Sequence, residues 1–253
     1  MFRGIFGQSR RRLVVSVVAS GRRGAIDRRT PGPVVRMGGR GALLAVVLAV
    51  ACQAATPGAL ARSDGQLAND LNAVWSYVIQ TPTSQNPFAT TNNRCHPLGQ
   101  QLLAPIQPFA PPSTSTTCTV KPGTSVFISE LSAECSTAEP SPFHGDDPAA
   151  LRACSRSVLL GPVGDFSTHQ LTLDGAAVPL KFIQAAPQAV TVPTDNVLGV
   201  TGQEALSDAA GWLAILHPMT PGTHSIVIHF GGTFQGSPLA EINYLTIIVK
   251  PGG

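Results

Sequence analysis

The chain has 253 residues, of which 12% are charged, and a formal net charge of +3. Ten of its 17 basic residues lie at or before Arg40, together with one acid, so residues 62–253 carry seven basic and thirteen acidic side chains and a net charge of −6. This balance disfavours a nucleic-acid partner, because such binding requires a basic face that displaces counterions from phosphates.

Residues 1–61 are typical of a leader that ends in a secretory signal peptide. The apolar run Ala42–Ala51 follows the basic residues, and Ala59-Leu60-Ala61 supplies a small-x-small cleavage site. The run is shorter than the roughly 20 residues that a membrane-spanning helix needs, so we expect no permanent membrane span. Because residues 37–61 form a complete signal by themselves, Met37 is the favoured start.

Two features of the leader point to alternatives. Cys52 follows Ala49-Val50-Ala51, which loosely resembles a lipoprotein cleavage box. Anchoring through a lipid on Cys52 is therefore the alternative to a secreted or cell-surface protein. The arginines of residues 9–13 also hint at a twin-arginine signal.

Residues 62–117 are expected to hold one helix and then a Pro/Ser/Thr-rich irregular segment that packs on a β-sandwich. Ser63 or Asp64 can cap a helix that runs to Gln80. Apolar side chains fall on one face of this helix at helical spacing: Leu67, Leu71, Val74, Trp75 and Val78. From Thr81 to Thr117 the chain shows little periodicity, which predicts a long loop.

Four cysteines follow the leader: Cys95, Cys118, Cys135 and Cys154. An even number in an exported chain implies two disulfides, and three pairings are open. We favour bonds between neighbours, Cys95–Cys118 and Cys135–Cys154. A zinc site is the rival interpretation, but the chain has no C-x-x-C pair and the spacings are wide.

Residues 118–253 are expected to form the core of an all-β protein, an antiparallel β-sandwich of the jelly-roll or immunoglobulin-like type. Turn signals separate its predicted strands: Lys121-Pro122-Gly123 between 116–120 and 124–131, Asp174-Gly175 between 169–173 and 177–182, and 218–223 between 211–217 and 224–230. The last strand, 239–249, is expected to be central. One short helix is predicted over Pro148–Cys154, capped by Asp147.

Several of these motifs recur in an order that carries a resemblance. Cys118-Thr-Val-Lys-Pro-Gly123 leads to Glu134-Cys135, then to the Asp174-Gly175 hairpin and to Leu216-His-Pro-Met-Thr-Pro-Gly-Thr-His-Ser-Ile. This pattern resembles a family of uncharacterised secreted microbial β-rich proteins over residues 72–250. The resemblance implies export and a β-rich fold, and it implies no activity, substrate or cofactor.

The loop between Cys135 and Cys154 is rich in carboxylates. Glu139, Asp146 and Asp147 are candidate metal ligands, because Ca²⁺ takes about 6–8 oxygens. The order of an EF-hand is missing, and Asp147 already has a capping role. A solvated loop without metal is the favoured interpretation.

Glu130, Glu134 and His144 are the catalytic candidates. Glu130 shares a predicted strand face with apolar residues, where a carboxylate is costly unless it is paired. With Glu134 it could form the acid/base pair of a glycosidase-like site. The alternative places Glu130 at a strand end, in reach of solvent or a backbone N–H group.

Three histidines, His217, His224 and His229, lie on one predicted hairpin. A metal centre built from all three is disfavoured, because His224 and His229 point to opposite faces of a regular strand. His224 is expected to donate a hydrogen bond to a loop carbonyl instead.

No catalytic signature stands out, so we expect a non-catalytic extracellular binding or surface module for a glycan or protein ligand, without a cofactor. A secreted carboxylate-dependent hydrolase acting on glycans is the alternative. A purely structural component of the cell envelope is the third.

Overall fold

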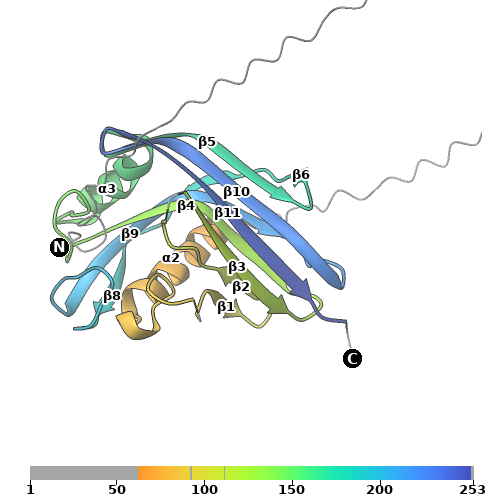
Figure 1. Ribbon diagram of the computed structural model, residues 1–253. Helices are drawn as coiled ribbons and strands as arrows, with labels where there is room; N and C mark the ends of the chain where they lie inside the picture. The colour runs from red at the N-terminus through yellow and green to blue at the C-terminus, as the bar shows by residue number, and fades with distance from the viewer. Residues whose placement is uncertain (1–61, 92, 111, 252–253) are drawn as a thin grey trace, which may run out of the picture. The chain divides into compact units, whose positions relative to one another are not determined.

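The computed structural model describes residues 62–91, 93–110 and 112–251, so the predicted leader with Met37 and Cys52 lies outside the described residues (Figure 1). Two β-sheets pack face to face around a hydrophobic core, which confirms the predicted β-sandwich with an N-terminal and an internal helix. The first sheet has the order β1-β2-β4-β9-β7, with β8 also paired to β9. The second has the order β3-β11-β10-β5-β6.

The strands of the first sheet are β1 (Cys95–Gly99), β2 (Leu102–Pro105), β4 (Ser125–Ser136), β7 (Lys181–Gln184), β8 (Gln188–Val192) and β9 (Gln203–Leu216). Those of the second sheet are β3 (Ser113–Val120), β5 (Gly164–Leu173), β6 (Ala176–Ala177), β10 (Gly222–Phe234) and β11 (Ser237–Val249). Strand β11 lies between β3 and β10, as predicted for a central strand.

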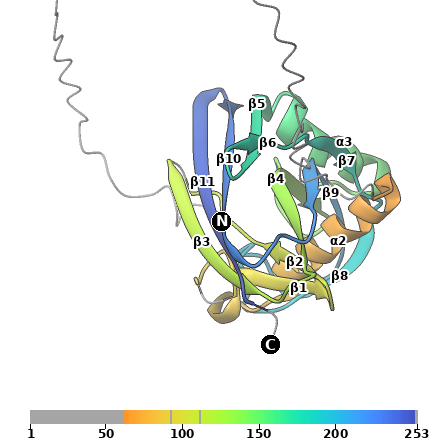
Figure 2. The ribbon, with the colours of Figure 1, turned by 90° about the vertical axis from the view of Figure 1, so that its right-hand side faces the viewer.

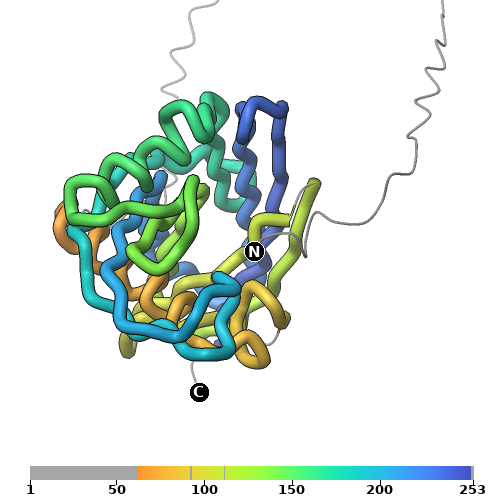
Figure 3. Tube along the Cα trace, turned by 90° about the vertical axis from the view of Figure 1, so that its left-hand side faces the viewer, coloured from red at the N-terminus to blue at the C-terminus, as the bar shows by residue number. Residues whose placement is uncertain are grey.

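The sheets are mixed, which corrects the expectation of a wholly antiparallel sandwich. Strand β2 pairs with β4 in parallel, and β3 pairs with β11 in parallel along its whole length. Figures 2 and 3 show β3 and β11 side by side from opposite sides of the molecule. Sequence patterns report which strands exist, whereas pairing between distant strands depends on the whole fold.

Two of the predicted turns connect the two sheets, so the hairpin predicted around 218–223 is wrong. The turn at Lys121-Pro122-Gly123 leads from β3 in the second sheet to β4 in the first, and the turn at 218–223 leads from β9 in the first sheet to β10 in the second. The same turn residues serve a hairpin and a sheet-to-sheet crossing, so composition alone does not separate them. The Asp174-Gly175 hairpin is confirmed, and both residues have positive φ. The strand predicted over 177–182 is wrong, because β6 ends at Ala177 and Lys181 begins β7 in the first sheet.

Helix α2 (Asp64–Gln80) begins with the predicted cap. The Ser63 hydroxyl accepts from the Gln66 backbone N–H, and the Gln66 side chain accepts from the Ser63 N–H in return. Leu71 and Val78 pack against Phe127 of β4, on the face of the first sheet that is turned away from the second. Helix α2 therefore covers the outer face of the first sheet.

Helix α3 (Pro148–Leu160) is longer than predicted and begins where predicted, with Asp147 accepting from the Ala150 N–H and proline at the first position. Its buried residues Leu151, Val158 and Leu159 belong to the core between the sheets. The helix contacts β4 and β9 of the first sheet and β5 of the second. No helix among the described residues is long and apolar enough to cross a membrane.

The segment from Thr81 to Thr117 is more regular than predicted. It contains a short 3₁₀ turn (Thr83–Gln85), strands β1 and β2, and the first part of β3. Strand β3 reads Ser-Thr-Ser-Thr-Thr at its start, and alternate residues there are exposed. Because serine and threonine show no apolar alternation, the first part of β3 was missed, and only residues 116–120 were predicted as a strand.

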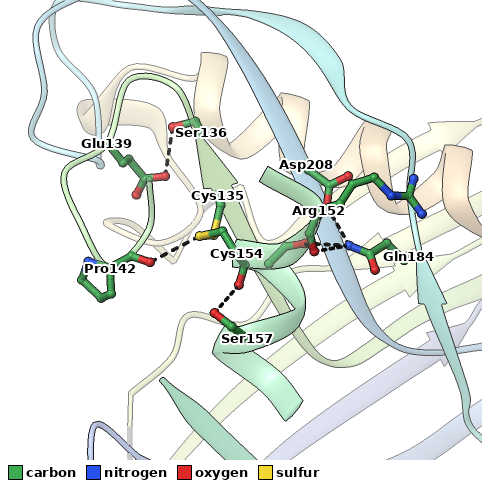
Figure 4. The surroundings of a disulfide bond; sticks show 10 residues. Cys135, Ser136, Glu139, Pro142, Arg152, Cys154, Ser157, Gln184 and Asp208 are labelled. Atoms are coloured by element: carbon green, nitrogen blue, oxygen red, sulfur yellow. Dashed lines mark hydrogen bonds between the residues drawn. A yellow bond between two sulfur atoms is a disulfide. The ribbon is translucent and has the colours of Figure 1, made fainter. Parts of the chain in front are cut away.

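Both disulfides join the predicted neighbours. Cys95–Cys118 ties β1 to β3, and Cys135–Cys154 ties β4 to α3. Figure 4 shows the second bond, with the Cys154 sulfur close to the Pro142 carbonyl and the Ser157 hydroxyl donating to the Cys154 carbonyl. The two bonds fasten one strand to the opposite sheet and one helix into the core.

Candidate functional site

A cavity of about 110 Å³ lies where α2, β2, β4, β10 and β11 meet. Most of its walls are apolar, and a smaller set of polar side chains converges on it. The polar lining residues are Gln107, Ser129, Glu130, Ser132, Glu241 and Asn243. The aromatic ones are Trp75, Phe88, Phe109, Phe127 and Phe230.

The cavity forms beside the edge of β4. Strand β2 pairs with β4 at Ser125 and Val126, so the later residues of β4 lack a β2 partner. A β-bulge between Ser129 and Leu131 leaves Glu130 as the extra residue of this strand. Trp75 of α2 lies over the free edge, where its indole N–H donates to the Ser132 hydroxyl at 3.2 Å. The loop after β2 supplies a further wall through residues 106–109.

The second sheet contributes two pairs of side chains to the cavity. Glu241 of β11 stands opposite Phe230 of β10, and Asn243 stands opposite Ile228. All four line the cavity. The carboxylate of Glu241 accepts from the Ala110 backbone N–H at 3.2 Å through Oε2, while Oε1 has no hydrogen-bond partner.

Glu241 is 0% exposed, so its charge is removed from water. Burial raises the pKa of Glu241, and hydrogen bonds from the Asn243 side chain and the Ala110 backbone oppose that shift. None of the ion pairs formed by the described residues includes Glu241. Its negative charge therefore has no cationic counterpart in this part of the protein.

Two more polar atoms of the cavity lining are buried without a partner. Gln107 uses its Oε1 to accept from the hydroxyls of Thr114 and Thr116, and its Nε2 is left unpaired. The Ser129 hydroxyl is likewise unpaired. With Glu241 Oε1, the cavity presents a donor, a hydroxyl and an acceptor. Buried polar atoms normally have partners, so this group is suited to bind a ligand with complementary atoms.

Glu130 reaches across the space between the sheets to His169 of β5, and its Oε2 lies 2.9 Å from Nδ1 of the imidazole. The His169 Nε2 donates to the Phe166 carbonyl at 3.0 Å, and the ring stacks on Trp212 with centroids 3.6 Å apart. The non-catalytic interpretation placed Glu130 at a strand end, in reach of solvent or a backbone N–H group. Glu130 is instead buried within β4, and a backbone hydrogen bond from Gln170 stabilises its carboxylate.

The charges of this pair depend on burial and on each other. Burial raises the pKa of Glu130, and the hydrogen bond and charge of His169 partly oppose that shift. Burial lowers the pKa of His169, but its contacts with Glu130 outweigh this and leave the pKa raised. Each group thus favours the charged form of the other.

Glu134, the predicted acid/base partner of Glu130, has different neighbours. Burial raises its pKa well above the ordinary value, and the nearby charge of Glu139 raises it further. Burial also raises the pKa of Glu139, which accepts from the Ser136 hydroxyl at 3.0 Å. Figure 4 shows Glu139 and Ser136 beside the second disulfide. Neither Glu134 nor Glu139 lines the cavity.

The pair Glu134 and Glu139 makes folding pH-dependent. Because the folded state raises the pKa of Glu134, it keeps a proton that the unfolded chain releases above about pH 4.5, the ordinary value. The free energy of unfolding therefore falls as pH rises through this window. We expect Glu134→Gln to make the free energy of unfolding less dependent on pH. At pH 8 the substitution should stabilise the protein by on the order of 1 kcal/mol.

Urea unfolding of Glu134→Gln and the unmodified protein at pH 4.5, 6 and 8 measures this effect. Glu204→Gln, at an exposed residue of β9, is the control and should follow the unmodified protein. Parallel pH profiles for the unmodified protein and Glu134→Gln would contradict the assignment.

The candidate metal ligands are directed to separate partners. Glu139 faces Ser136, Asp146 pairs with the exposed His144 at 2.8 Å, and Asp147 caps α3. The hydrogen bond with Asp146 raises the pKa of His144. Within the described residues no group of three or more His, Cys, Asp or Glu is placed to hold a metal ion.

The three histidines are divided between the sheets. His217 follows β9, whereas His224 and His229 lie on β10, so the predicted hairpin that would carry all three does not exist. The expected hydrogen bond from His224 to a loop carbonyl is confirmed, since its Nε2 donates to Thr220 at 2.9 Å. Its Nδ1 faces Asp174 at 2.7 Å.

Sequence reasoning identified Glu130 and missed Glu241, Asn243 and Gln107. The sequence held a signal for two of them. Glu241 and Asn243 lie at every second position of β11, on the same buried face as Leu245 and Ile247. Glu130 likewise shares a strand face with apolar residues. Gln107 lies in a loop between Pro105 and Pro108 and had no such signal.

Comparisons with known proteins add no family. No protein-family model matches the chain, and a search of curated proteins finds no relative. The solution structure of Amebosin matches 56% of this chain and 100% of its own chain, with 13% sequence identity and a TM-score of 0.17. A score this low carries no argument about fold or function.

Proposed function

We propose that this chain is an exported, non-catalytic binding module that holds a small ligand in the cavity between its sheets. The observation that supports this is the convergence of unpaired polar atoms from Gln107, Ser129 and Glu241 on one cavity with apolar walls. Ligand sites combine such walls with a few placed polar groups. An engineered cavity of about 150 Å³ accommodates benzene, so about 110 Å³ suits a compact molecule or a small end group.

Export is supported by the signal-like residues 37–61 and by the two disulfides, which persist in oxidising compartments. The intact mass of protein recovered from culture fluid tests this part. We expect a chain that starts after Ala61 and lacks free thiols. A mass increase that corresponds to a lipid on Cys52 would indicate a membrane-anchored lipoprotein instead of a secreted protein. An uncleaved chain with reduced cysteines inside the cell would contradict export.

Binding can be followed through Trp75, which lines the cavity. The chain has two tryptophans, so Trp212→Phe leaves Trp75 as the single indole reporter. We expect at least one of benzene, n-butanol, n-butylammonium and butyrate to change Trp75 emission and to raise the melting temperature.

Ser129→Leu fills the cavity and should abolish that response, because Ser129 lines it. Ser237→Leu, at the exposed start of β11, should leave the response intact. Absence of any response, or an equal response in Ser129→Leu, would overturn the proposed site.

The carboxylate-dependent hydrolase is the second candidate function, and it is favoured by one observation. Glu130 and Glu241 line the same cavity, and burial raises the pKa of both, as a general acid requires. The small volume argues against a glycan chain in this space. Cleavage of a glycan by the unmodified protein that is lost in Glu130→Gln would establish the hydrolase in place of the binding module.

A further inference from the structure

We infer that the cavity selects an organic cation, a primary ammonium group on a short apolar body, through Glu241. This inference deepens the proposed function and rests on it. The cavity lining contains two carboxylates, Glu130 and Glu241, and no lysine, arginine or histidine. The two carboxylates differ in whether a cationic side chain lies close to them.

The negative charge of Glu130 already has a partner within the protein, His169. His169 lies 2.9 Å from its Oε2 and is held in place by the Phe166 carbonyl and by stacking on Trp212. A ligand therefore gains little by pairing with Glu130. The charge that is open to a ligand belongs to Glu241.

Glu241 has no counterion among the described residues and is fully buried. The groups that hydrogen-bond to its carboxylate, the Ala110 N–H and the Asn243 side chain, are neutral, and Oε1 remains without a partner. A buried carboxylate without a cation is energetically unfavourable, so a cation that enters the cavity offsets a penalty that a neutral ligand leaves in place. Selectivity for positive charge follows from this difference.

The walls suit the rest of such a ligand. Ile228 and Val78 offer aliphatic contacts. Two aromatic side chains, Trp75 and Phe230, the cross-strand neighbour of Glu241, also line the cavity. Aromatic rings attract cations. The unpaired Gln107 Nε2 would favour ligands that also carry an acceptor, such as an amino alcohol. The volume limits the body to a handful of non-hydrogen atoms.

The test compares n-butylammonium with n-butanol, which has nearly the same size and no charge, by calorimetric titration of the folded protein. We expect n-butylammonium to bind the unmodified protein more tightly than n-butanol. Glu241→Gln should weaken n-butylammonium roughly ten- to a hundredfold, because it removes a charged hydrogen-bond partner. The same substitution should change the affinity for n-butanol by no more than about threefold. The control Glu204→Gln should change neither.

The outcomes separate the two proposals. Equal binding of both probes to the unmodified protein would overturn the preference for cations and leave the binding module standing. Binding of neither probe, nor of benzene or butyrate, would overturn both. If Glu241→Gln fails to fold, as judged by circular dichroism, the test uses the unmodified protein alone. The ratio of its affinities for n-butylammonium and n-butanol then decides whether the cavity prefers a cation. Tight binding of n-butylammonium that Ser129→Leu does not weaken would place the cation outside the cavity and contradict the inference.

Discussion

His169→Phe is expected to lower the free energy of unfolding by roughly 3–5 kcal/mol at pH 7, because it leaves the Glu130 carboxylate buried without its partner. The side chain of Glu130 is 0% exposed and that of His169 is 15% exposed. Phenylalanine keeps a ring against Trp212, so the variant removes the hydrogen bond and charge while it retains the stacking. Urea unfolding monitored by circular dichroism measures the change.

Two comparisons make this result specific to the buried pair. The destabilisation should shrink at pH 5, because the orphaned carboxyl group of Glu130, whose pKa is already raised by burial, binds a proton there. The double variant Glu130→Leu with His169→Phe should recover much of the loss, because it removes the unpaired charge. His229→Phe on β10 is the control, with a change within about 0.5 kcal/mol. A loss that is the same at both pH values and in the double variant would assign the effect to packing.

Removal of the Cys135–Cys154 disulfide in Cys135→Ala with Cys154→Ala is expected to cost about 3 kcal/mol. The bond closes a segment with a sequence separation of 19, so its loss restores conformational freedom to the unfolded chain. At this chain length the loss corresponds to a melting temperature lower by about 6–12 °C, which scanning calorimetry measures.

The second disulfide provides the matched comparison. Cys95–Cys118 has a separation of 23, so loop entropy alone predicts almost the same loss for Cys95→Ala with Cys118→Ala. Cys118, Cys135 and Cys154 all belong to the hydrophobic core that includes α3, whereas Cys95 is only partly buried against it. Any larger loss for the Cys135–Cys154 pair therefore reports the packing of α3. An unchanged melting temperature in both double variants would contradict a stabilising role.

Local signals predicted the local structures. Ser63 and Asp147 are helix caps with side chains of the right kind immediately before an apolar periodic segment, and both cap the helices that they were expected to cap. Asp174-Gly175 is a hairpin turn because both residues tolerate positive φ. Each of these features is decided within a few residues of the chain.

Features that depend on distant strands could not be predicted in the same way. The sheet to which β9 and β10 belong is set by their partners β4, β7, β5 and β11, and the turn between them carries no information about those partners. Glu130 was found because it interrupts an apolar face. The cavity was not found, because it depends on how far β2 follows β4 and on where α2 places Trp75.

The parallel pairing of β3 with β11 constrains the order in which the protein can complete its folding. Thr114 hydrogen-bonds to Asn243, which follows it by 129 residues. In a chain that emerges from its amino end, β3 must wait for nearly all other described strands before its partner exists. Because contacts between residues so distant in sequence form slowly, we expect β3 to join the second sheet after the local β10–β11 hairpin has formed.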